Sequence, residues 1–194
     1  MRLPFIHYPC PGRPVQSRSA LTVPAPTESE YAECYARYIA RIPPGAVIDR
    51  LDSQLRTVCD LFRAMGEDRA AHRYAAGKWT IRETVGHMTD TERVMAYRAL
   101  RIARGDTTPL AGFDQDQFME HAGFEARALG SVVEEFTTTR EATLAMLRAF
   151  PADAFERMGT ASDHPVSVRA LAYIIAGHAD HHLEILRTHY GVVG

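Results

Sequence analysis

The spacing of apolar residues along the chain predicts an all-α protein built on four long helices. Apolar positions three and four residues apart mark one face of an amphipathic helix. Together with the residues that bound each segment, this rhythm places long helices over 47–65, 80–104, 129–150 and 167–189. A shorter extra helix is predicted over 27–42, where Pro43 and Pro44 follow and end it.

Local start signals support these boundaries. Thr80 with Glu83 has the form of a capping box, in which each residue satisfies a free backbone amide of the other. Ser167 stands where the last helix needs an N-cap. The helices that begin after Thr80 and after Ser167 therefore have defined start positions.

Four amphipathic helices of this length bury their apolar faces most simply as a four-helix bundle. No run of alternating β-branched residues predicts a strand. We therefore expect one bundle domain over residues 27–194. Residues 1–26 hold six of the eleven prolines and no acidic residue, which predicts a flexible or extended leader that contributes little to the core.

The longest irregular connection runs over residues 106–130 and contains Pro109, Gly112 and Gly123. Long loops within a compact domain are often functional. Its acidic residues Asp114 and Asp116 are candidates to line the mouth of a site, although acidic loop residues are more often solvated surface.

Composition narrows the classes of function. The chain carries 22 Lys and Arg against 24 Asp and Glu, a net charge of -2, so it has no general basic field for nucleic acid. No apolar run approaches the roughly 18–20 residues of a membrane span. Cys10, Cys34 and Cys59 show no CxxC spacing, which argues against a disulfide framework. We expect a cytoplasmic protein that acts on a small molecule, with no nucleic-acid or membrane partner.

Histidine is the informative residue type, with nine in the chain. At about 100° per residue, five positions of the last helix fall within an arc of roughly 60°: Leu171, Ile175, His178, His182 and His189. Two imidazoles one turn apart thus point at an apolar core, where their ring nitrogens lack partners. The spacing of His178 and His182 is equally typical of metal ligands and of ordinary helix histidines.

A third ligand is expected from another helix. His87 lies at the edge of the apolar arc of helix 80–104, near its N-terminal end, and meets the pair if the two helices are neighbours. Three histidine ligands leave coordination positions open, as in catalytic sites. Ala179 stands where metalloproteases with the H-E-x-x-H motif carry their general base, so that class is excluded.

Glu92 falls inside the apolar arc of its helix, where an unpaired carboxylate is costly. It is a candidate metal ligand, a partner of a ligand, a general base, or the partner of a buried arginine. His181 lies about 80° to 90° from the stripe of the last helix and is expected at the surface or beside the ligands. His189 lies on the stripe, and we expect it to pack.

Two motifs resemble a known family. Residues 78–92, LysTrpThrIleArgGluThrValGlyHisMetThrAspThrGlu, and residues 176–182, AlaGlyHisAlaAspHisHis, are similar to the DinB-like superfamily of metal-dependent hydrolases and thiol-dependent S-transferases. The resemblance covers about residues 45–190. It implies a four-helix bundle, frequently a homodimer, that binds a divalent ion such as zinc or nickel. On matching positions the ligands are His87, His178 and His182.

Two classes of function follow. In the first, a metal ion on three histidines lowers the pKa of an open-site ligand, either water for hydrolysis or the thiol of a low-molecular-weight cosubstrate for S-transfer. The thiol version is favoured because no obvious general base accompanies the ligands. The alternative is a non-catalytic metal-binding stress-response bundle. A ferritin-like di-iron centre needs Glu-x-x-His pairs, which this chain lacks.

Overall fold

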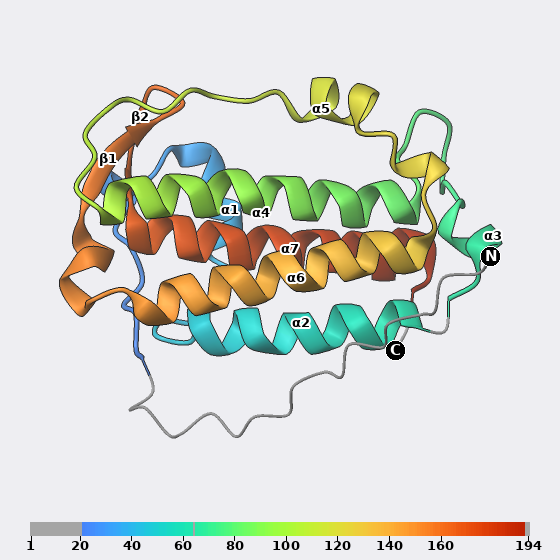
Figure 1. Cartoon of the computed structure of the whole chain (residues 1–194), viewed down its shortest axis with the longest axis horizontal. Helices are drawn as coiled ribbons and strands as arrows, with labels where there is room; N and C mark the ends of the chain where they lie inside the picture. Colours follow the sequence, from blue (N-terminus) through green and yellow to red (C-terminus); the bar gives the residue numbers. More distant parts are fainter. Residues whose placement is uncertain (1–20, 64, 193–194) are drawn as a thin grey trace, which may run out of the picture.

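The structure is a computed structural model that describes residues 21–63 and 65–192, and it confirms the four-helix bundle (Figure 1). The bundle helices are α2 (Val47–Arg63), α4 (Ile81–Ala103), α6 (Leu129–Ala149) and α7 (Val168–Tyr190). Three shorter helices accompany them, namely α1 (Ala36–Ile39), α3 (Glu67–Ala70) and α5 (Gln115–Ala122). None of the helices in this part of the chain is long and apolar enough to cross a membrane.

The bundle has two pairs of parallel helices. Figure 1 shows α2 and α7 running in one direction and α4 and α6 in the other. Both α2 and α4 pack against α6 and against α7, so the first turns of α4 lie beside the last turns of α7. Because α4 and α6 are parallel, residues 104–128 must cross the length of the bundle to connect them, and α5 lies on this crossover.

The predicted caps form at the start of both site-bearing helices. Thr80 Oγ1 accepts a hydrogen bond from the amide of Glu83 (3.1 Å), and Glu83 Oε2 accepts one from the amide of Thr80 (2.7 Å). Ser167 Oγ accepts from the amide of Ala170 (2.9 Å). These bonds satisfy free amides of the first turns, and they set where each helix begins.

The structure contains a hairpin where no strand is predicted. β1 (Met158–Ala161) pairs antiparallel with β2 (His164–Ser167), and both residues of the turn, Ser162 and Asp163, have positive φ angles of 52° and 64°. The strands are four residues long, too short for a period of two to stand out. Part of their support is distant in sequence, because Leu110 of the crossover exchanges backbone hydrogen bonds with Thr160 and Ser162 (both 2.9 Å).

The connection between α4 and α6 is also more ordered than predicted. Besides α5, it contains the 3-10 turn η3 (Phe124–Ala126). Asp114 caps α5 by accepting from the amides of Asp116 (2.9 Å) and Gln117 (3.1 Å). A further 3-10 turn, η4 (Ala152–Glu156), follows α6.

The predicted helix over 27–42 is broken into three pieces. The Thr27 and Glu30 capping box forms, but it opens only the 3-10 turn η1 (Glu28–Glu30), after which Tyr31 is extended. The turn η2 (Glu33–Tyr35) and α1 follow. Glu30 instead turns to α7, where its carboxylate accepts from Arg169 at 2.5 and 2.7 Å.

Part of the predicted leader belongs to the core. Residues 1–20 lie outside the described residues, but in 21–26 the side chain of Val23 is 1% exposed and joins the apolar core. The carbonyl of Val23 accepts from the Tyr173 hydroxyl of α7 (2.9 Å), which itself accepts from the amide of Gly45 (2.9 Å). These contacts hold an extended segment whose own sequence has no periodic signal.

A polar layer crosses the middle of the bundle, formed by Gln54 of α2, Glu92 of α4, Arg140 of α6 and Asp180 of α7. Arg140 is 0% exposed, and its Nε and Nη2 donate to the carboxylate of Glu92 at 2.7–2.9 Å. Its Nη1 donates to Gln54 Oε1 (2.8 Å). Gln54 Nε2 donates to Asp180 Oδ1 (2.8 Å), and Arg50 caps the chain by donating to Asp180 at 2.7–3.1 Å.

The polar layer lies between two apolar clusters of the core. One cluster includes Leu51, Met95, Leu144 and Leu171. The other includes Val58, Met88, Phe136 and Leu183. On α2, α4 and α6 the polar residue stands three or four positions from its apolar neighbours in each cluster, so the layer occupies one helical turn of the interior.

The replacement Arg140→Met tests the layer. It leaves the carboxylate of Glu92 buried without a counter-charge, so we expect the free energy of unfolding to fall by about 3–5 kcal/mol in urea denaturation. In the double variant Arg140→Met/Glu92→Leu both charges are gone, and we expect less destabilisation than in Arg140→Met alone. A double variant as unstable as the sum of the two single ones would show that the pair is not coupled.

The first helix crosses α7 at Gly177. An ideal Cβ atom on Gly177 would lie 2.0 Å from the carbonyl oxygen of Tyr38, so no other residue fits without moving the α1 backbone. This close approach places the Tyr38 ring edge-on to the ring of His178, with 5.4 Å between centroids.

Gly177→Ala is expected to destabilise the protein by about 1–3 kcal/mol, although alanine is the better helix former. The matched control is Gly130→Ala in α6, where an added Cβ meets nothing within 4 Å and helix propensity predicts a gain of up to about 1 kcal/mol. Equal effects of the two substitutions on the urea midpoint would contradict the close packing of α1 on α7.

Candidate metal centre

The structure brings His87, His178 and His182 together at the contact of α4 with α7. His87 lies in the second turn of α4, and His178 and His182 lie at the middle of the antiparallel α7 and one turn beyond it. Their exposed fractions are 3%, 6% and 8%. The three side chains form the group of potential metal ligands found in the described residues, with one ligand atom from each, and these atoms lie within 4.8 Å of one another.

The Nε2 atom of His178 lies close to the Nε2 atoms of both other histidines. His178 Nε2 is 3.1 Å from His87 Nε2 and 3.1 Å from His182 Nε2. Two nitrogens that each lie about 2.0–2.1 Å from a tetrahedral zinc ion are about 3.3–3.4 Å apart. The donor set therefore has the chemistry and nearly the spacing that a divalent ion requires.

Burial keeps these imidazoles neutral. It lowers the pKa of His87 to about 4. It also lowers the pKa values of His178 and His182 well below the ordinary value, and the neighbouring imidazoles lower them further. A neutral imidazole keeps a lone pair for a metal ion. All three nitrogens are thus available as ligands at neutral pH.

Two aromatic side chains hold the imidazoles from outside. The Trp79 ring packs on His87 at 4.6 Å between centroids, and Tyr38 contacts both His178 and His181. Neither residue was expected at the site from periodicity, since Tyr38 comes from a short distant segment. The only signal for Trp79 is its place in the motif at 78–92.

A second observation concerns Thr91, one helical turn beyond His87 on α4. It is 4% exposed, and its Oγ1 is buried with no hydrogen-bond partner among the described residues. Buried hydroxyls rarely stay unpaired. The helix face that carries His87 therefore has unused hydrogen-bonding capacity one turn from this histidine.

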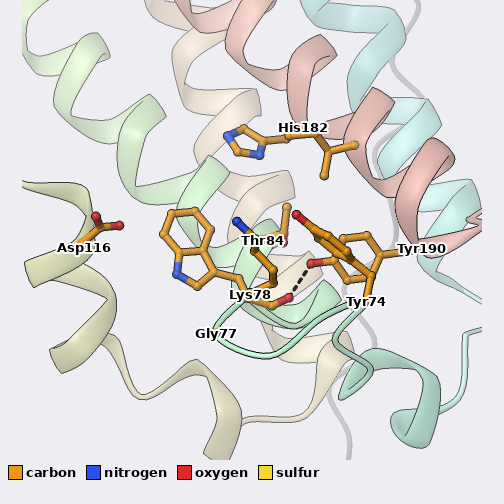
Figure 2. Close-up of a pocket in the computed structure, with 9 residues that line it drawn as sticks. Tyr74, Gly77, Lys78, Thr84, Asp116, His182 and Tyr190 are labelled. Carbon is orange, nitrogen blue, oxygen red and sulfur yellow. Dashed lines mark hydrogen bonds between the residues drawn. The ribbon is translucent and has the colours of Figure 1, made fainter.

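A pocket of about 350 Å³ opens beside the cluster. Figure 2 shows His182 at one end, Lys78 reaching between its walls, and Asp116 on the far side from Tyr74 and Tyr190. Trp79 lines the same space. A small molecule in this pocket therefore has access to the histidine cluster.

The remaining predicted residues fall in different places. Asp116 lines the pocket, whereas Asp114 caps α5. Glu92 is outside the histidine group and is bound by Arg140, which is one of the roles considered for it. His181 is half-buried against Tyr38 and His182.

His189 is exposed, and its ring stacks on Tyr74 at 4.9 Å. Its packing is thus on the surface, because the end of α7 extends past the core. His7 lies outside the described residues.

Comparison with known proteins agrees with the four-helix bundle fold. The chain has the fold of a solved Bacillus subtilis protein, YfiT, described as a probable metal-dependent hydrolase with an unusual four-helix bundle topology. The TM-score is 0.66 at 16% identity, over 87% of this chain and 96% of YfiT. No curated protein matches the sequence significantly. The family model of the DinB superfamily matches residues 50–186, and the chain therefore belongs to that superfamily.

Proposed function

We propose that His87, His178 and His182 bind one divalent ion, zinc or nickel, and that the protein is a metal-dependent enzyme. The proposed reaction is transfer of a low-molecular-weight thiol to an electrophilic small molecule, with hydrolysis by water as the alternative chemistry. The observation that carries the proposal is the grouping of three buried neutral imidazoles, in which His178 Nε2 lies 3.1 Å from the Nε2 atoms of both His87 and His182.

The energetics of burial support a bound ion. Among the described residues, His87 Nε2 and His182 Nε2 each have only His178 Nε2 within hydrogen-bond distance. In a neutral imidazole only one of the two ring nitrogens carries a proton, and the other can only accept a hydrogen bond. Three Nε2 atoms grouped in this way therefore cannot all satisfy one another's hydrogen-bonding needs. A cation at their centre satisfies all three. The relative with this fold, YfiT, is described as a probable metal-dependent hydrolase.

The pocket supports a catalytic site over a structural one. Structural zinc sites have four protein ligands, whereas catalytic sites have three and an open position. Such an ion acts as a Lewis acid and lowers the pKa of a thiol or water bound to it. Trp79 and Tyr38 fix the imidazoles, and the pocket beside His182 admits the small molecule.

The two buried carboxylates on the histidine-bearing helices favour a thiol over water. Glu92 is held by Arg140, and Asp180 is held by Arg50 and Gln54. Neither is free to take a proton from water. A thiol has a pKa near 8.5, far below that of water, and it needs less help from a base.

Removal of a ligand is expected to abolish stoichiometric metal binding. We expect about one ion per chain for the purified untagged protein by elemental analysis, and for His87→Ala a loss of affinity greater than the roughly 10–100-fold effect of a residue that only supports a ligand. Circular dichroism should show retained helix. The control is His189→Ala, because His189 is an exposed histidine outside the cluster. Full metal content in His87→Ala would refute the assignment.

X-ray absorption at the metal edge distinguishes the catalytic from the non-catalytic function. We expect three imidazoles with one or more oxygen ligands, and replacement of oxygen by sulfur when a small thiol is added, because the fourth position is open. An ion whose coordination never changes with thiol or water would favour the non-catalytic metal-binding bundle.

A further inference from the structure

Building on the proposed function, we infer that the pocket beside the three histidines selects a zwitterionic small molecule, with its carboxylate facing Lys78 and its ammonium group facing Asp116. An amino acid or a short peptide with a free amino group has this charge pattern. The two side chains come from different segments, the loop before α4 and the crossover helix α5.

Lys78 is the only lysine in the chain, and its backbone is firmly held. Its carbonyl accepts from Arg73 Nη1 (2.5 Å), and its amide donates to the carbonyl of Ala75 (3.2 Å). The carbonyl of the next residue, Trp79, accepts from the Tyr190 hydroxyl. The loop is thus fastened on both sides, and Figure 2 shows the lysine side chain extending into the pocket.

The ammonium group of Lys78 is not used within the described structure. Many arginines of the chain are paired with carboxylates, for example Arg50, Arg73 and Arg140. In every ion pair among the described residues the cation is an arginine. No carboxylate of these residues lies within 4.0 Å of the Lys78 ammonium group. A cation that lines a pocket and has no internal partner is suited to an anionic group of a ligand.

Asp116 carries the opposite charge and is equally unused. The cap of α5 is formed by Asp114, so the Asp116 carboxylate is not needed there. In the described part of the chain no arginine or lysine lies within 4.0 Å of it.

Lys78 and Asp116 line one pocket without pairing with each other. Figure 2 shows them apart, with Asp116 across the pocket from the tyrosines. Two opposite charges that share a cavity but leave a gap match a ligand with separated charges of its own. The volume of about 350 Å³ is at the lower end of small-molecule sites, and the aromatic rings of Tyr74, Trp79 and Tyr190 offer apolar contact to the atoms between.

The charge balance of the metal site agrees with this pattern. The three imidazoles are neutral, and in the described residues no carboxylate belongs to their group. A divalent ion there keeps its full charge, so a ligand that presents a thiolate to the ion, a carboxylate to Lys78 and an ammonium group to Asp116 balances each charge locally.

Four thiols that share the reactive group and differ in charge test the inference. L-cysteine carries both charged groups, 3-mercaptopropionate only the carboxylate, cysteamine only the ammonium group, and 2-mercaptoethanol neither. Their Kd values are measured by calorimetry on the full zinc-loaded chain. We expect L-cysteine to bind tightest, with each missing group weakening binding about five- to tenfold.

Two variants assign the charges. Lys78→Met should abolish the preference for L-cysteine over cysteamine, and Lys78→Arg should keep it. Asp116→Asn should abolish the preference for L-cysteine over 3-mercaptopropionate. Glu120→Gln is the control for Asp116→Asn, because Glu120 is an exposed acid on the same helix that does not line the pocket.

The outcomes separate the two proposals. Equal affinities for the four thiols, or preferences that survive both variants, overturn the zwitterion inference and leave the metal function standing. If zinc or thiols do not bind, the proposed function fails. The charges are then tested with L-serine, ethanolamine and 3-hydroxypropionate on the metal-free chain, followed by the NMR indole signal of Trp79, the only tryptophan. Selection for serine that depends on Lys78 and Asp116 supports the inference, and its absence overturns it.

Discussion

The whole arrangement depends on the burial of one guanidinium group, that of Arg140. A charge with no access to water must have its hydrogen bonds satisfied by the protein, and here the partners come from two other helices, with the chain of bonds continuing to the fourth. The helices cannot slide along one another without breaking these bonds. Their mutual register is therefore set at the middle of the bundle.

That register reaches the candidate metal centre through α7. Asp180, the end of the polar layer, lies between His178 and His182 in the sequence, on a different face of the helix. On α4, Glu92 stands five residues after His87. The two helices that supply imidazoles are thus the two helices that supply carboxylates to the layer, and the same contact fixes both. The 3.1 Å distance between His87 Nε2 and His178 Nε2, which joins the two helices, follows from how the bundle is aligned.

The sequence predicted those features that are local and periodic. The four helices, the caps at Thr80 and Ser167, and the grouping of three histidines all follow from spacing at 3.6 residues per turn. The hairpin at 158–167 and the burial of Val23 were not predicted, because their stability comes from Leu110 and Tyr173, distant in the chain. For Glu92, periodicity indicated burial, but with many arginines present it gave no means to select Arg140. Trp79 and Tyr38 reach the site through loops and short helices that carry no period.

The crossover between the parallel helices α4 and α6 contributes to the pocket, whereas the bundle helices carry the histidine cluster. Leu110 fastens it to the hairpin at one end, and Phe124 packs on α4 at the other, while Asp116 lies over the pocket between them. The three clustered histidines are elsewhere, on α4 and α7. Mutations that accumulate in the crossover can change what enters the pocket while the bundle and its imidazoles stay intact. This topology therefore allows descendants of one ancestral protein to change the lining of the pocket without changing the histidine cluster beside it.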